Sequence, residues 1–264
     1  MAERTPASRM SLATVLVLTF AFLYIPIAVL VILSFNAGGL PTAWTGFSVK
    51  WYVALLGNAD ILGAALNTLI VAVVSTLIAA VLGTLLALGI ETRRRRGRAL
   101  EALIFAPMII PDIVLAIALL SFFSLLKVPM GLHTIIVSHV VFNLAFVSAV
   151  VRARLKGFDW SVTEASADLG ASGFTTFRRV TLPLILPAVI AGALLAFSLS
   201  VDEFIIAFFT AGAGRASTTL PMQIFAMIRF GVTPEINALA TLVMIVSVTA
   251  LALSQRLNRG VIAP

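Results

Sequence analysis

Two long stretches of the chain, residues 11–35 and 61–90, contain no charged side chain. A helix needs about 20 mostly apolar residues to cross the hydrocarbon core of a bilayer, so each stretch is long enough to span it. The apolar residues run continuously instead of alternating, which favours helices over a membrane β-barrel. Reading the rest of the chain between its charges completes a set of six predicted spans: 12–35, 66–90, 100–126, 133–152, 182–208 and 236–257.

The composition supports the same interpretation. Of the 264 residues, 61% are hydrophobic and only 11% are charged, against roughly 25% charged in a typical soluble domain. So few polar side chains cannot cover a soluble surface, and a disordered chain would be poorer in apolar residues. We therefore predict an all-α membrane protein with six transmembrane helices, organised as one domain over residues 1–264.

The basic residues predict how the chain is oriented. All but four of the 18 Lys and Arg lie at one set of span ends, and the exceptions are Lys50, Lys127, Arg215 and Arg229. Because cytoplasmic loops carry the excess of Lys and Arg, both termini and the loops 91–98 and 153–181 are predicted to be cytoplasmic. The run 93–96 is typical of a topology determinant beside anionic lipid, so we expect membrane lipid and no nucleic acid as a partner.

Asp112, Asp202 and Glu203 lie well inside the predicted spans, where a charge costs about 3 kcal/mol even on the lenient insertion scale. On a continuous helix Asp112 would lie near the middle of the third span, and Asp202 and Glu203 would lie nearer the external end of the fifth. One interpretation is an anionic route for a cation. The alternatives are that Asp112 is a protonated or capped structural residue, and that Asp202 and Glu203 pair with Arg215 or Arg229.

The external segment 36–60 holds three large aromatic residues, Trp44, Trp51 and Tyr52. An aromatic belt at the membrane interface would explain them. The alternative places Trp51 and Tyr52 on the substrate path.

The cytoplasmic loop predicts two short helices outside the membrane. Ser161 followed three residues later by Glu164 is typical of a capping box, so a helix should begin there. Gly170 can supply a left-handed stop, and a second helix would run from about Ser172 to Val180. Pro183 would then lie near the start of the fifth span.

This loop resembles the EAA loop of bacterial ABC importer permeases, in which E-A-A is followed by three residues, Gly, nine residues and I-x-L-P. The matching residues here are Glu164, Ala165, Ser166, Gly170, Val180, Leu182 and Pro183, with Ser166 for Ala and Val180 for Ile as the departures. The resemblance implies the type I ABC importer permease fold. It also implies that the loop docks on an ATP-hydrolysing subunit, with Glu164, Ala165, Ser166, Gly170, Leu182 and Pro183 carrying the coupling.

Nearly the whole chain is similar to the second permease subunit of spermidine/putrescine importers. The pieces that carry the similarity include Tyr24-Ile25-Pro26-Ile27, Pro111-Asp112-Ile113-Val114, Arg154-Leu155-Lys156-Gly157-Phe158-Asp159, Val201-Asp202-Glu203-Phe204 and Pro234-Glu235-Ile236-Asn237-Ala238-Leu239. One departure is Glu203, where many polyamine permeases carry a second Asp. The similarity implies a multi-pass protein of the bacterial inner membrane that translocates polyamines together with a second homologous permease, two ATP-binding subunits and an extracytoplasmic substrate-binding protein.

No motif for chemistry is present in the sequence itself. It contains no cysteine, no G-x-x-x-x-G-K-[ST] phosphate loop and no H-E-x-x-H, so ATP hydrolysis must come from a separate subunit. His133 and His139 are six residues apart and do not share a helix face, so we expect a loop residue and a packed polar residue. We therefore predict a non-catalytic subunit without metal or cofactor. The alternatives are an import permease for iron, an opine or an amino-acid-like solute, and an autonomous secondary carrier.

Overall fold

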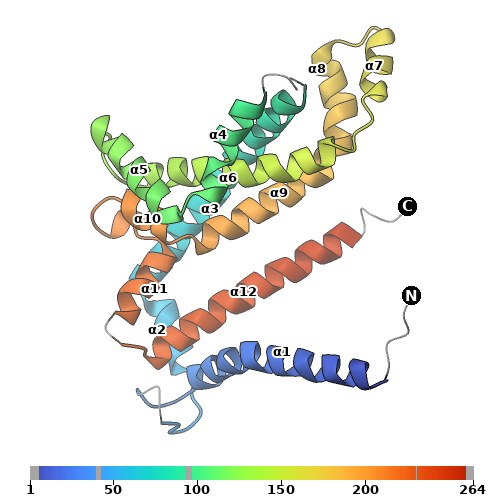
Figure 1. Cartoon of the computed structure of the whole chain (residues 1–264). Helices are drawn as coiled ribbons and strands as arrows, with labels where there is room; N and C mark the ends of the chain where they lie inside the picture. The colour runs from blue at the N-terminus through green and yellow to red at the C-terminus, as the bar shows by residue number, and fades with distance from the viewer. Residues whose placement is uncertain (1–5, 40–42, 93–96, 230, 260–264) are drawn as a thin grey trace. The chain divides into compact units, whose positions relative to one another are not determined.

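The computed structural model describes residues 6–39, 43–92, 97–229 and 231–259, and within these ranges the chain is almost entirely helical (Figure 1). The chain divides into two compact units, Met1–Ala59 with Ile224–Pro264, and Asp60–Gln223. In chain order the elements are α1 (Pro6–Ser34), α2 (Lys50–Gly57), α3 (Ala59–Thr92), α4 (Gly97–Ile109), α5 (Asp112–Leu125), α6 (Leu132–Leu155), α7 (Ser161–Asp168), α8 (Gly173–Thr176), the π-helix η1 (Phe177–Thr181), α9 (Leu182–Asp202), α10 (Ile205–Thr210), the 3-10 helix η2 (Arg215–Ser217), α11 (Leu220–Ile228) and α12 (Pro234–Arg259).

In the first unit, α12 packs against α1 and α2. The apolar side chains of α1 remain exposed within the unit, as expected of a helix whose solvent is lipid. The segment after α1 folds around Asn36, which is fully buried. Its side-chain amide donates to the Ala43 carbonyl at 2.7 Å, and its Oδ1 accepts from the Thr45 N–H at 2.9 Å.

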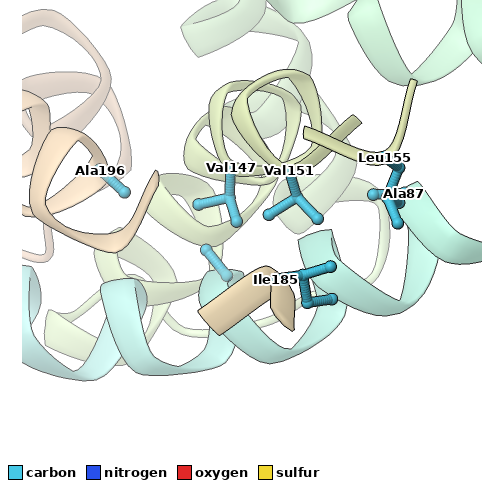
Figure 2. Close-up of a cluster of buried hydrophobic side chains, with 7 residues drawn as sticks. Ala87, Val147, Val151, Leu155, Ile185 and Ala196 are labelled. Atoms are coloured by element: carbon cyan, nitrogen blue, oxygen red, sulfur yellow. The ribbon is translucent and has the colours of Figure 1, made fainter. Parts of the chain in front are cut away.

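The core of the second unit is a seam between α3, α6 and α9, in which alanines pack against Val, Leu and Ile side chains (Figure 2). Val147 of α6 lies against two glycines: a Cβ at Gly83 would come within 2.9 Å of the Val147 side chain, and one at Gly192 within 3.3 Å of its Cα. Glycine therefore permits both close approaches, which is the usual way in which membrane helices pack without a hydrophobic driving force between them.

Five of the six predicted spans correspond to apolar helices at the expected places. Four are long and apolar enough to cross a bilayer: Ala13–Ser34, Ala59–Thr92, Leu132–Leu155 and the composite helix Gly173–Asp202. The sixth predicted span corresponds to α12, whose shorter apolar part is Pro234–Thr249. The helices of the second, fourth and sixth spans extend beyond the predicted limits at both ends, because charged residues are tolerated at helix ends beyond the apolar core, whereas that of the fifth span begins earlier and ends earlier than predicted.

The third predicted span, 100–126, is not one continuous helix. The axes of α4 and α5 differ by 117° across the break at residues 110–111. The ring of Pro111 disfavours a helical conformation in the residue before it, so the helix ends and a new one begins at Asp112. Pro107, in contrast, lies within α4 without ending it. The continuous helix that was assumed for the depth of Asp112 is therefore absent from this segment, and its depth in the membrane stays a prediction.

The fifth predicted span, 182–208, is interrupted as well. Helix α9 ends at Asp202, Glu203 has an extended backbone, and the separate short helix α10 follows. No proline or glycine lies at this second break.

Candidate functional site

Both helix breaks of the second unit carry acidic residues. Asp112 is the first residue of α5, Asp202 is the last residue of α9, and Glu203 follows it. Helices α5 and α10 pack along each other, with Ala116 of α5 and Ile206 of α10 in one buried cluster, so the breaks that carry Asp112 and Glu203 lie near one another. The side chains of Asp112 and Asp202 are exposed within the unit, whereas Glu203 is buried. The structure thus brings together three acidic residues that are up to 91 positions apart in sequence.

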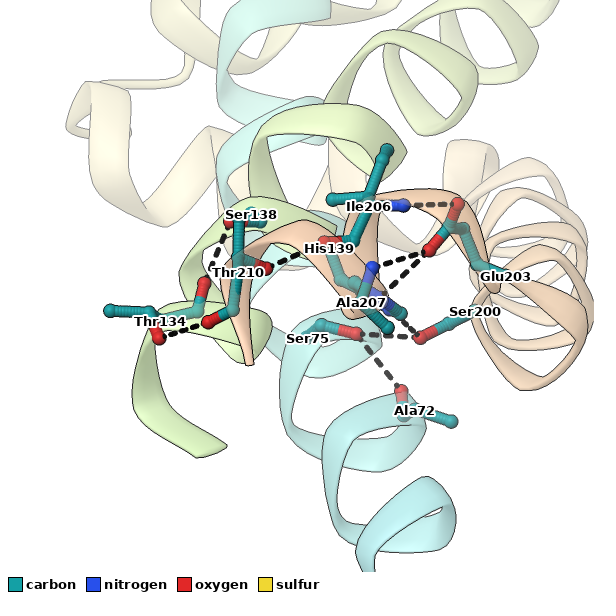
Figure 3. Close-up of polar contacts among 10 residues, drawn as sticks. All are labelled: Ala72, Ser75, Thr134, Ser138, His139, Ser200, Glu203, Ile206, Ala207 and Thr210. Carbon is teal, nitrogen blue, oxygen red and sulfur yellow. Dashed lines mark hydrogen bonds and ion pairs between the residues drawn. The ribbon is translucent and has the colours of Figure 1, made fainter. Parts of the chain in front are cut away.

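Glu203 caps the short helix α10 (Figure 3). Its Oε1 accepts from the Ile206 N–H at 2.8 Å, and its Oε2 accepts from the Ala207 N–H at 2.9 Å. These are N–H groups of the first turn, which have no partner within the helix, and they stabilise a negative charge. Glu203 therefore caps α10, a role that sequence reasoning missed, because an acid two residues before a short helix gives no distinct signal inside a long apolar run.

Arg215 is not the partner of these carboxylates. Its guanidinium pairs with Asp60 at the start of α3, at 2.6 Å between Nη1 and Oδ1. Asn67, also on α3, donates to the carbonyl of Thr218 at 2.9 Å and so holds the same turn. The alternative in which Asp202 or Glu203 pairs with Arg215 is therefore wrong: Asp60 lies 155 positions away in sequence, and only the folded chain brings it there.

Trp51 and Tyr52 lie on α2 of the first unit, half-buried. The indole N–H of Trp51 donates to the Asn36 carbonyl at 2.8 Å, and Lys50 lies over the Trp51 ring. The hydroxyl of Tyr52 lies 2.6 Å from the Ser34 hydroxyl. Both polar groups thus have partners at the end of α1, and their placement on a substrate path stays a prediction.

The loop between α6 and α9 contains two short helices, as the sequence predicts. Helix α7 begins at Ser161, but not through a capping box. The carboxylate of Asp159 accepts from the Ser161 N–H at 3.0 Å instead, and hydrogen bonds with Ser161 hold the pKa of Asp159 below its usual value. An acid two residues before the helix competes well for this N–H, because it offers a full negative charge to the helix N-terminus.

Gly170 ends α7 in the left-handed conformation, with φ of +82°. The N–H groups of Gly170 and Ala171 donate back to the carbonyls of Ala167 and Ser166, which is a Schellman motif. The hydroxyl of Ser166 also lies 3.0 Å from the Thr176 hydroxyl of α8. Ser166, the residue that departs from E-A-A, therefore links the two short helices.

The tip of this loop exposes apolar side chains. Leu169 is 89% exposed and Phe174 is 73% exposed, on either side of the turn at Gly170. Glu164 and Ala165 are exposed on α7. Isolated exposed apolar residues are common, but two at one projecting turn are typical of a surface that a partner covers.

The base of the loop is joined to the seam. Phe158, Trp160 and Leu182 pack against the buried cluster of α3, α6 and α9. Thr181 is buried, and Pro183 lies in the first turn of α9, where its missing N–H costs nothing. Between α8 and α9 the Leu182 N–H donates to the Phe177 carbonyl, five residues back, as in a π-helix. Movement of the loop would therefore act directly on α9.

The fold and these two features, broken apolar helices and a projecting loop, define a membrane transport component. The family described as binding-protein-dependent transport system inner membrane component matches residues 79–261, and the chain belongs to it. This assignment confirms the family that the loop motif predicted.

Similarity to individual curated proteins is more specific than the match to the family. The spermidine/putrescine transport system permease protein PotC of Escherichia coli (strain K12) is 42% identical over 241 residues, covering 91% of this chain and 90% of the relative. The putrescine transport system permease protein PotI of the same strain is 42% identical over 238 residues, covering 87% and 84%. PotC of Haemophilus influenzae is 38% identical over 241 residues, covering 91% and 93%.

Solved structures show the fold. A chain of a bacterial ABC transporter involved in the import of the acidic polysaccharide alginate aligns with a TM-score of 0.75 at 15% identity, over 97% of this chain and 99% of that one. A chain of the MetNI methionine ABC transporter aligns with a TM-score of 0.63 at 23% identity, over 77% and 96%. The chain therefore has the fold of type I ABC importer permeases.

Proposed function

We propose that this chain is the non-catalytic transmembrane subunit of an ATP-driven importer that moves polyamines such as spermidine and putrescine into the cell. The observation that carries the proposal is the pair of helix breaks with the exposed carboxylates Asp112 and Asp202. The names of the curated relatives, which match most of the chain, support the substrate.

The physical argument concerns the cost of moving a multiply charged cation out of water. A fixed carboxylate lowers that cost more strongly in a region of low dielectric than at the surface. Asp202 has a further advantage, because it lies at the C-terminal end of α9, where the helix dipole and the last carbonyls favour positive charge. Asp112 and Glu203 lie at helix starts and offset the positive dipole there, which would otherwise repel a cation.

The proposed assembly contains four kinds of component. A second, homologous permease completes the path, two ATP-binding subunits dock on the loop 153–181, and an extracytoplasmic protein delivers the substrate. The exposed Leu169 and Phe174 at the projecting turn support the docking role of the loop. Trp51 and Tyr52, aromatic residues of the predicted external segment, belong to the proposed path. The whole chain acts as one permease domain in the bacterial inner membrane.

Reporter fusions test the proposed orientation. Fusions after Arg98 and Arg179 are expected to report the cytoplasm, and fusions after Trp51 and Arg215 the external side, because Lys and Arg gather at the cytoplasmic ends. Alkaline phosphatase and a fluorescent protein as paired reporters give opposite signals on each side. An external signal after Arg179 would contradict both the orientation and the docking of ATP-binding subunits on this loop.

Uptake in cells tests the substrate. A strain without the chain's gene is expected to lose saturable uptake of labelled spermidine or putrescine and to regain it when the gene is returned. Unlabelled polyamines should compete, whereas an iron chelate, an opine and an amino acid should not. Competition by one of those solutes with no effect of polyamines would assign the importer to that solute instead.

A further inference from the structure

His139 of α6 is fully buried between α3, α9 and α10, in a chain of polar contacts (Figure 3). Its Nδ1 lies 2.6 Å from the Ser200 hydroxyl of α9, and that hydroxyl lies 3.2 Å from the Ser75 hydroxyl of α3. Its Nε2 lies 3.5 Å from Oε2 of Glu203. Through these contacts the His139 ring links α6, α9 and α3 to Glu203, the residue that caps α10.

The partners of the ring fix its hydrogen bonding. A carboxylate accepts only, so we assign the ring proton to Nε2, which lies within ion-pair distance of Oε2 but has no hydrogen bond in the described part of the chain. In the neutral ring Nδ1 is then the acceptor, and Ser200 must donate to it. The Ser200 oxygen is left to accept from Ser75. The Ser75 hydroxyl also lies 3.4 Å from the Ala72 carbonyl, a second acceptor, so the assigned roles run from Ser200 through His139 to Glu203.

Helix α10 depends on such side-chain contacts for its position. It has only six residues, and isolated helices shorter than about 12 are not stable by themselves. Helix α6 holds both of its ends: the Thr134 hydroxyl donates to the Thr210 carbonyl at 2.6 Å, and His139 faces the cap at the other end. The place where α9 stops, and hence the orientation of Asp202, therefore depends on the contact between His139 and Glu203.

We propose that His139 is a positioning residue for the substrate path. Through the ion-pair contact of its Nε2 with Oε2, at 3.5 Å, it keeps that carboxylate on the first turn of α10 and fixes the break at which Asp202 is exposed. This inference rests on the proposed function, in which Asp112 and Asp202 line the path of a cation. His139 itself, at 1% exposure, does not reach a solute.

The neighbouring turn of α6 offers a matched control. Asn143 lies four residues further on and is also fully buried, and within the described residues neither atom of its side-chain amide has a hydrogen-bond partner. Asn143→Ala therefore removes an equally buried polar side chain from the same helix without breaking a hydrogen bond. A loss of uptake that comes only from disturbing the packing of α6 would appear in this variant too.

Two substitutions at His139 separate its contacts. His139→Asn retains an amide near the position of Nδ1 for Ser200 but does not reach Glu203, whereas His139→Gln places an amide N–H near the position of Nε2. At equal amounts of assembled complex, His139→Asn is expected to lower the maximal uptake rate roughly tenfold or more, as for other displaced positioning groups. KM should be unchanged, because the separate binding protein captures the solute. His139→Gln should recover most of the rate, and Asn143→Ala should stay near wild type.

A double-variant cycle gives the decisive result. If His139 acts through Glu203, then His139→Asn adds no further loss to Glu203→Gln. The positioning role would be overturned if the losses of the two single variants multiply in the double variant, or if His139→Asn transports at the wild-type rate. It would also be overturned if Asn143→Ala loses as much uptake as His139→Asn, or if the His139→Asn complex fails to assemble. Asp112→Asn and Asp202→Asn, measured in parallel, keep the two proposals apart. If the two aspartate variants lose uptake and His139→Asn does not, only the proposed role of His139 is wrong. If the aspartate variants also transport normally, the proposed path of carboxylates is wrong.

Discussion

Replacing Asp112 with Asn should abolish most polyamine uptake while leaving the complex assembled and its binding protein functional. The substitution keeps the shape of the side chain and removes a charge that is exposed at the start of α5. In the described part of the chain, no hydrogen bond that holds the fold uses the Asp112 carboxylate. A loss of at least tenfold is expected, corresponding to about 1.4 kcal/mol of lost stabilisation of the cation. The measurement is initial uptake of labelled spermidine at matched amounts of complex in the membrane.

Asp60→Asn is the matched control for Asp112→Asn. It removes one negative charge from the start of α3, where the partner is the exposed Arg215, and exposed ion pairs contribute little. Its uptake should stay near wild type.

Asp202→Asn should give a smaller loss that is partly additive with that of Asp112→Asn. Normal transport by Asp112→Asn would make the residue structural and leave only the similarity to known permeases in support of a polyamine.

Gly170→Val should uncouple ATP hydrolysis from transport. Gly170 has a φ of +82°, and a β-branched residue there costs about 1–3 kcal/mol of backbone strain. No atom lies within 4 Å of an added Cβ, so the strain acts only on the turn between α7 and α8. Displacing this turn moves Leu169 and Phe174, and we expect binding protein and substrate to stimulate ATPase activity no longer.

Gly173→Val tests whether the turn or the added bulk matters. Gly173 lies in the same loop, has an ordinary φ and also has open space around it, so the same substitution should leave coupling near wild type. Glu164→Arg should resemble Gly170→Val, because it reverses a charge in the first turn of α7 and opposes the helix dipole. Substrate-stimulated ATPase activity and uptake at wild-type levels in both Gly170→Val and Glu164→Arg would refute the docking of this loop.

Local signals in the sequence predicted the local features of the loop. Gly170 ends α7 and Ser172 caps α8 through the Thr175 N–H, because glycine and serine act within a few residues of themselves. The start of α7 was predicted at the right residue for the wrong reason. The carboxylate of Asp159, and not a capping box of Ser161 and Glu164, accepts from the N–H at the start of α7. The sequence offers both caps, and only the backbone geometry shows which one forms.

The two helix breaks differ in how much the sequence reveals. Pro111 marks the first break locally, although it does not give the angle of 117°. The second break has no such residue, and its cap depends on Glu203, which follows α9, and on His139 of α6. His139 was predicted as a packed polar residue, and its burial confirms that prediction. Its partners could not be predicted, because no periodicity in the sequence encodes the register of α6 against α9.

The most direct test of the central claim is uptake by the purified complex in proteoliposomes, formed from this chain, its partner permease, the ATP-binding subunits and the binding protein. With ATP on the side of the ATP-binding subunits, labelled spermidine or putrescine should accumulate inside the vesicle against its gradient. Without ATP, or with this chain alone, no accumulation should occur. Accumulation by the chain alone without ATP would make it an autonomous carrier, and ATP-driven accumulation of a different solute in place of polyamines would contradict the proposed substrate.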